Sequence, residues 1–188
     1  MKELIVAATC FVSLICCPNA SLGAQPIENA ESFRRLAFEP LPANSWKMFN
    51  VGANDQMLNL PYGRSYYAAV ALPPGSGTLE LRMQQPPIPF AGIKCVMACA
   101  TFLDQKFRIT RAIDSKQAYL APGTFRPLEN PLFEMRVEKK ATDQYILLHK
   151  DAGLVGKKIL YDFAIGVRPY TPTAKGHIRV KFFPSTPQ

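Results

Sequence analysis

From Trp46 onward, apolar and polar residues alternate with a period of two in four separate runs. An alternation of this kind gives a strand one apolar and one polar face. Strands with a polar face belong to antiparallel sheets, because parallel sheets are usually covered on both sides. The apolar positions are 79, 81 and 83; 133, 135 and 137; 159, 161, 163, 165 and 167; and 178, 180 and 182. The pattern predicts an antiparallel all-β domain over residues 46–188.

Segments rich in proline and glycine separate the runs. "LPPGSGT" (72–78) predicts a tight turn between a strand in 65–72 and the strand that follows, and "DQKF" (104–107) predicts a hairpin turn. "LAPGTFRPLENP" (120–131) and "YTPTAKG" (170–176) predict longer loops. About eight or nine short strands joined in this way are typical of a jelly-roll-like β-sandwich, with a partly open barrel as the alternative.

Residues 25–45 precede the alternating region and predict one short helix. Phe33, Leu36 and Ala37 share a face at helical spacing, and Pro40 and Pro42 end the pattern. We therefore expect an N-terminal extension with a short helix that caps part of the larger domain.

Residues 1–24 have the pattern of a secretory signal peptide. Lys2 precedes an apolar run from Leu4 to Cys17, which is too short to span a bilayer comfortably, and small residues follow. A signal peptide would direct export of the protein, and its cleavage is expected after Gly23 or Ala24. The alternative is a lipoprotein anchored through Cys17, because "LICC" approaches a lipobox, although Cys16 stands where a small residue is usual.

The chain has a net charge of +8, and removing Lys2 and Glu3 with the signal peptide leaves that charge unchanged. A basic exported protein can be drawn to anionic surfaces such as lipid head groups or cell-wall polymers. A charge of this size also simply keeps a protein in solution. The basic residues form no dense patch, so we expect no nucleic acid partner.

Candidate catalytic residues are few. A nucleophilic site needs a serine or cysteine beside a histidine with an orienting carboxylate. His149 has Asp151 two residues away, but no G-x-S-x-G motif is present, and we expect His149 to be a polar residue at a strand end. His177 falls on a polar strand face, and "GLVGKK" (153–158) lacks the spacing of a phosphate loop and predicts a turn. The sequence predicts neither enzymatic activity nor a cofactor.

Cys95 and Cys99 are the cysteines that follow the predicted signal peptide. A zinc site would need two more ligands at suitable spacing, and thioredoxin-like chemistry would need C-x-x-C at a helix start. Export permits a disulfide between them, provided that the chain turns, since four strand residues span about 13 Å and bridged Cα atoms lie within about 7 Å. A disulfide and two reduced, buried thiols both remain open, and either would be structural.

Aromatic residues are the remaining candidates for a binding site, because sugars stack on exposed rings. Trp46, Tyr66 and Tyr67 are the strongest candidates. Tyr66 and Tyr67 are adjacent, so on a strand they face opposite sides. The alternative is that these rings fill the core or its rim, with their hydroxyl groups hydrogen-bonded.

Three segments resemble the MalM family, periplasmic proteins encoded with maltose uptake systems. Residues 65–73 match a family strand S-x-x-x-A-x-x-L-P, residues 77–81 match G-x-L-E-L, and residues 100–104 match a strand that ends in aspartate before a turn. The resemblance spans about residues 46–168. The cysteine-containing stretch "IKCVMAC" departs from the family pattern.

The resemblance implies a periplasmic, non-catalytic β-domain that assists maltose or maltodextrin transport by binding carbohydrate or a transport component. The alternative is an envelope-associated structural or assembly protein that contacts anionic envelope surfaces, located at the outer membrane if Cys17 carries a lipid anchor.

Overall fold

The structure is a computed structural model that describes residues 26–84, 96–117, 119–120, 132–163 and 166–185. The predicted signal peptide, its cleavage region at 23–25, Cys17 and Cys95 lie outside the described residues. No helix in the described part of the chain is long and apolar enough to cross a membrane.

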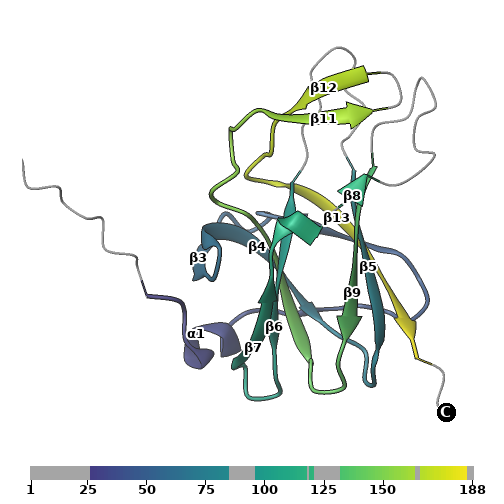
Figure 1. Ribbon diagram of the computed structural model, residues 1–188. Coiled ribbons are helices and arrows are strands. Elements are labelled where there is room, and N and C mark those ends of the chain that lie inside the picture. The colour runs from purple at the N-terminus through teal and green to yellow at the C-terminus, as the bar shows by residue number, and fades with distance from the viewer. Residues whose placement is uncertain (1–25, 85–95, 118, 121–131, 164–165, 186–188) are drawn as a thin grey trace, which may run out of the picture.

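Two sheets form an all-β sandwich, as the alternating pattern predicts (Figure 1). Sheet I has the order β1 (Glu39–Pro40), β4 (Gly63–Ala71), β10 (Tyr145–Lys150), β6 (Ala98–Leu103) and β7 (Ile109–Ile113), and β3 (Met57–Leu60) also pairs with β4. Sheet II has the order β2 (Lys47–Val51), β13 (Gly176–Pro184), β5 (Gly77–Gln84), β9 (Leu132–Lys139) and β8 (Tyr119–Leu120). A separate hairpin joins β11 (Ile159–Phe163) to β12 (Gly166–Tyr170). Neighbouring strands are antiparallel except β1 and β4, which are parallel.

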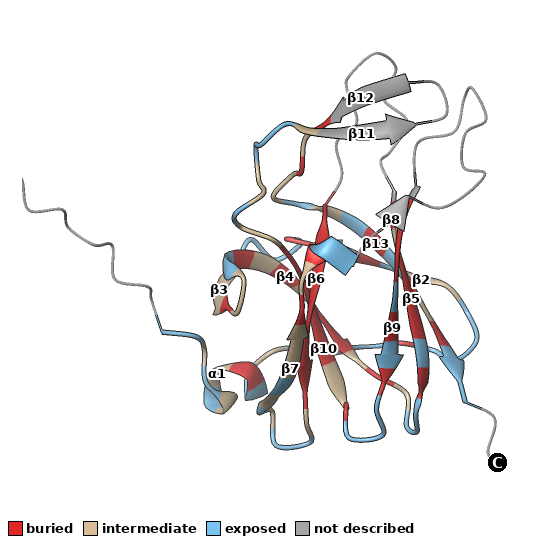
Figure 2. Cartoon of the chain, in the orientation of Figure 1, coloured by how far each residue is buried: buried red, intermediate tan, exposed pale blue. Residues whose placement is uncertain are grey.

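The main core lies between the two sheets, where Figure 2 shows a continuous buried layer. The apolar positions predicted on β5, β9 and β13 are buried there, together with Phe102 of β6 and Val70 of β4. Burial of this layer removes its apolar surface from water, which is the dominant stabilising contribution to folding.

A second, smaller core covers the outer face of sheet I. The predicted short helix is present as α1 (Ala30–Arg34), and the side chain of its N-cap Asn29 accepts hydrogen bonds from two backbone amides of the first turn. Phe33 inserts from α1 against Leu147 and Leu103 of sheet I. The helix ends before Ala37, which is exposed. The N-terminal extension therefore packs on sheet I as an integral part of the fold.

Two sequence predictions about connections are wrong. The segment 72–76 forms no hairpin turn, because β4 belongs to sheet I and β5 to sheet II, so the chain crosses from one sheet to the other. Residues 158–167 form no single strand, because the chain reverses between β11 and β12 and the two strands pair with each other. The predicted hairpin at 104–107 is confirmed, since it joins β6 to β7.

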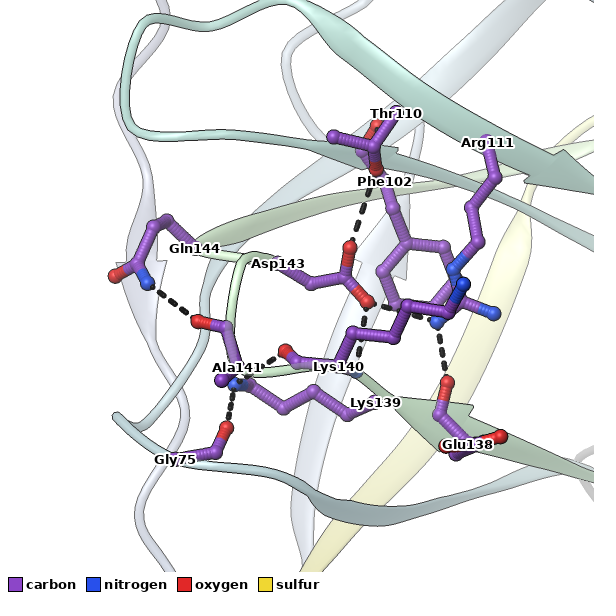
Figure 3. Close-up of polar contacts among 10 residues, drawn as sticks. All are labelled: Gly75, Phe102, Thr110, Arg111, Glu138, Lys139, Lys140, Ala141, Asp143 and Gln144. Carbon is purple, nitrogen blue, oxygen red and sulfur yellow. Dashed lines mark hydrogen bonds and ion pairs between the residues drawn. The ribbon is translucent and has the colours of Figure 1, made fainter.

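A buried ionic network ties the two sheets together at one end of the sandwich (Figure 3). Asp143 lies in the connection from β9 of sheet II to β10 of sheet I. Its carboxylate pairs with Arg111 at 2.8 Å and accepts hydrogen bonds from the Thr110 hydroxyl and the Lys140 backbone amide. Arg111 also donates to the Glu138 carbonyl oxygen, and its guanidinium carbon lies 4.0 Å from the centroid of the Phe102 ring.

A buried lysine completes the same end of the molecule. Lys139 Nζ donates to the backbone carbonyl oxygens of Gly75 and Lys140, and it lies 5.5 Å from the ring centroid of Phe182. Gly75 belongs to the connection from β4 of sheet I to β5 of sheet II, which also crosses between the sheets. Burial lowers the pKa of Lys139 from its usual value, and Asp143 opposes that effect. The β4–β5 and β9–β10 connections are thus held by buried polar contacts at this end of the sandwich.

Candidate functional site

The three candidate aromatic residues lie on three different surfaces and do not form one platform. Trp46 lies on the outer face of sheet II, with the guanidinium groups of Arg82 and Arg179 at 4.3 Å and 5.5 Å from its ring centroid. Tyr66 packs against the main core. Tyr67 faces the opposite side of β4 and belongs to the second core. Tyr67 lines the cavity described next.

A groove of about 360 Å³ lies beside β4, and we call it the β4 groove. Its volume falls within the range of small-ligand sites. The segment after α1 forms one wall and the loop between β2 and β3 forms the other, while Tyr67 and Ala69 of β4 contribute from the sheet. The lining residues are Arg35, Leu36, Ala37, Ala53, Asn54, Gln56, Tyr67 and Ala69.

The groove lies where the edge of sheet I is incomplete. β3 pairs with β4 only as far as Tyr66, and β1 pairs only with Val70 and Ala71. Among the described strands, none pairs with residues 67–69 on this edge, although the Gly52 backbone amide donates to the Tyr67 carbonyl oxygen. Gly52 has φ of +91°, a conformation that glycine adopts readily, and it ends β2 at the start of the loop that leads to β3. The open edge thus leaves room for the cavity.

A hydrogen-bonded chain of side chains gives the groove its polar character. The Tyr67 hydroxyl donates to Gln56 Oε1 at 3.0 Å and accepts from Asn54 Nδ2 at 3.0 Å. Asn54 Oδ1 accepts from the Gln56 backbone amide at 3.2 Å. The Gln56 side-chain nitrogen has no hydrogen-bond partner among the described residues. The groove therefore combines oriented amides and a fixed hydroxyl with the apolar surface of Leu36 and of three alanines.

His149 lies one residue before the end of β10, as predicted, but it is fully buried. Its Nδ1 lies 3.1 Å from the Lys150 carbonyl oxygen and therefore carries the proton, because a carbonyl only accepts. Its Nε2 accepts from the Thr101 hydroxyl at 2.9 Å, and Tyr62 stacks on the ring with centroids 6.2 Å apart. Burial lowers the pKa of His149 from 6.5 to about 4. The imidazole is neutral at physiological pH.

Cys99 lies directly opposite His149 in the β6–β10 pairing, but the two do not form an activated nucleophile. Burial, reinforced by the charge of Asp151, raises the pKa of the Cys99 thiol to about 12. The thiol is therefore protonated, whereas a reactive cysteine needs a lowered pKa. The Asp151 carboxylate accepts from the Ser115 hydroxyl and the Gly153 amide. Cys99 is free in the described structure, and because Cys95 lies outside it, the Cys95–Cys99 disulfide stays a prediction.

The buried His149 predicts a loss of stability in weak acid. Its folded pKa of about 4 is below its unfolded value of 6.5, so only the unfolded state takes up a proton between these values. The contribution of His149 is complete above pH 6.5, decreases as the pH falls toward 4 and amounts to about 3 kcal/mol. Urea unfolding at several pH values measures this slope.

A substitution of His149 itself provides the control for that measurement. His149→Gln should flatten the dependence of unfolding free energy on pH between 6.5 and 4, because the titrating group is then absent. An unchanged slope in His149→Gln would show that His149 does not titrate as its burial requires.

Comparison with known proteins provides no independent assignment for this site. No family model matches the chain. No curated protein and no solved structure is significantly similar to it. Among the described residues, no group of three or more His, Cys, Asp or Glu side chains is arranged to hold a metal ion. A functional assignment therefore depends on the geometry of the β4 groove.

Proposed function

We propose that this protein is an exported, non-catalytic binding protein of the periplasm that takes up carbohydrate in the β4 groove. The hydrogen-bonded chain Asn54–Tyr67–Gln56 carries this proposal. The resemblance to the MalM family supplies the substrate class, maltose or a longer maltodextrin, and a role in assisting its transport.

The chemistry of the groove suits a sugar better than a strongly charged or fully apolar ligand. Sugar hydroxyls donate and accept hydrogen bonds, and so do the side-chain amides of Asn54 and Gln56. Tyr67 holds both amides in place before a ligand arrives, which reduces the entropy lost on binding. Ala53 and Ala69 offer small apolar surfaces for the C–H faces of a sugar ring.

The state of Cys99 and His149 supports binding rather than nucleophilic catalysis. The thiol is protonated and the imidazole is held neutral by burial, with both ring nitrogens already hydrogen-bonded. Nucleophilic catalysis needs the opposite arrangement, in which a base withdraws the proton from the attacking group.

Thermal unfolding with a panel of sugars tests the proposed ligand class. A ligand that binds only the folded state at about 100 times its Kd adds about 2.7 kcal/mol to the unfolding free energy and raises the Tm. We expect millimolar maltose or maltohexaose to raise the Tm of the wild type but not of the double variant Asn54→Ala/Gln56→Ala. Asn50→Ala removes an exposed amide of β2 that does not line the groove, and it should respond as the wild type does.

Two outcomes of this experiment count against the proposal in different ways. An increase in Tm with cellobiose but not with maltodextrins would keep carbohydrate binding and reject the link to maltose transport. An equal increase in the wild type and in the Asn54→Ala/Gln56→Ala variant would place the sugar outside the β4 groove.

A further inference from the structure

The outer face of sheet II carries a strip of basic and apolar side chains that the β4 groove does not involve. Arg179, Lys181 and Phe183 alternate with the buried residues of β13 and therefore point away from the core. Met48 of β2 lies directly opposite Arg179, and Trp46 precedes β2 and contacts Arg179. We call these five residues the β13 strip. It extends about 13 Å along the strand from position 179 to position 183.

The basic residues of the β13 strip differ from their neighbours on the same face. Arg82 pairs with Glu80 at 2.7 Å and with Glu134 at 2.8 Å, and Glu80 also contacts Arg136. These carboxylates are buried and balanced by arginine. Arg179 and Lys181 form no ion pair with any described residue. The positive charge that remains on this face is therefore concentrated on β13.

Apolar side chains lie beside these two cations. Met48 is 60% exposed and Phe183 is 37% exposed, and the described part of the chain has just one other exposed large apolar residue, Ile27. Lys181 Nζ lies 4.5 Å from the Phe183 ring centroid, and Arg179 lies 5.5 Å from that of Trp46. The strip thus combines cations with aromatic and flexible apolar groups on the flat surface of a sheet.

We propose that the β13 strip docks on a bilayer surface that contains anionic phospholipids. Arginine and lysine bind the headgroup phosphates, while tryptophan, methionine and phenylalanine enter the boundary between headgroups and acyl chains. Charge complementarity favours an anionic partner, since the whole chain carries +8. The exposed apolar side chains favour a membrane over a soluble polyanion, which would leave them in contact with water.

The fluorescence of Trp46 reports directly on this surface, because Trp46 is the single tryptophan of the sequence. We expect vesicles of phosphatidylglycerol and phosphatidylcholine to shift its emission to shorter wavelength and to co-sediment with the protein. Vesicles of phosphatidylcholine alone should cause neither effect. Added salt should weaken the binding, because it screens the charges on both surfaces.

Two charge-matched double variants separate a docking site from a general effect of net charge. Arg179→Glu/Lys181→Glu and Lys157→Glu/Lys158→Glu both lower the net charge from +8 to +4. We expect the first to abolish co-sedimentation with the anionic vesicles and the second, which changes an exposed turn outside the strip, to retain it. If the first variant does not fold by circular dichroism, Arg179→Gln/Lys181→Gln provides the same comparison, with Lys157→Gln/Lys158→Gln as its control.

Three results would overturn membrane docking. These are an equal loss of binding in both double variants, no binding of the wild type to anionic vesicles, and retention on immobilised dextran sulfate without vesicle binding. The last of these would assign the strip to an acidic polysaccharide. The test is independent of the proposed sugar site. The Asn54→Ala/Gln56→Ala variant should bind vesicles as the wild type does, and maltodextrin should leave the Trp46 emission unchanged.

Discussion

Replacing Asp143 with alanine is expected to destabilise the folded protein by about 3–5 kcal/mol, because it leaves a partly buried arginine without its counter-charge. Asp143 is fully buried and is the carboxylate partner of Arg111. The Nε atom of Arg111 already lacks a hydrogen-bond partner within the described structure, so the variant removes a further partner from the same guanidinium group. The Thr110 hydroxyl and the Lys140 amide lose an acceptor as well. Urea unfolding measures the change.

An exposed carboxylate and a double variant serve as controls for this prediction. Glu31 forms exposed ion pairs with Arg34 and Arg35, so Glu31→Ala should cost less than about 1 kcal/mol. Removing both buried partners in Asp143→Ala/Arg111→Ala should cost less than the sum of the single changes, because no charge is then left unpaired. A loss below about 1 kcal/mol in Asp143→Ala would mean that the network does not hold the two sheets together.

Phe33→Ala is expected to lower the unfolding free energy by about 3–5 kcal/mol, the usual cost of removing a buried phenylalanine ring. Phe33 is only 1% exposed and packs in the second core with residues of sheet I. The variant leaves a cavity beneath α1 and removes the one buried side chain of that helix. Urea unfolding measures the effect.

Ile27 provides a control from the same extension, since it is 51% exposed. Ile27→Ala should change the unfolding free energy by less than about 0.5 kcal/mol, as surface substitutions usually do. If Phe33→Ala were equally mild, the extension would contribute little to the fold, and the wall of the β4 groove formed by residues 35–37 would not be fixed in place.

The alternating strands could be predicted from the sequence because their pattern is local. On β9, Phe133, Met135 and Val137 alternate with Arg136 and other polar residues, and side chains on a strand point to opposite faces in turn. The same reasoning identifies the inward faces of β5 and β13. Glu80 and Glu134 fall on the outer face as predicted, but alternation does not predict that they are buried there beside the arginine that pairs with them.

The second core could not be predicted from alternation, because its cover comes from a distant segment. Phe33, Leu36 and Phe38 pack in one cluster with Leu103 of β6 and Leu147 of β10. Farther along the same face, Tyr62 stacks on His149 and Ser115 lies beside Cys99, so all of β6 and most of β10 are buried. The sequence of these strands is accordingly a nearly continuous apolar run, "ACATFL" (98–103) and "YILLH" (145–149), rather than an alternation. A continuous run of this kind indicates a strand that is covered on both sides. That signal would have placed His149 in the interior.

The β4 groove has no local sequence signature. The groove exists because the pairing of β3 with β4 ends at Tyr66 and the pairing of β1 with β4 starts at Val70. These are two independent long-range contacts along one edge of the sheet. Asn54 and Gln56 lie in an irregular loop, where neither spacing nor periodicity marks them as partners of Tyr67. The sequence pointed to Tyr67 for its aromatic ring, whereas in the structure its hydroxyl joins the side chains of Asn54 and Gln56.

Isothermal titration of maltohexaose into the protein tests the carbohydrate site most directly. We predict a saturable binding heat with one ligand per chain for the wild type and for Asn50→Ala, and its loss in Asn54→Ala/Gln56→Ala while that variant remains folded. The absence of binding heat in the wild type, or an unchanged affinity in the Asn54→Ala/Gln56→Ala variant, would contradict carbohydrate binding in the β4 groove.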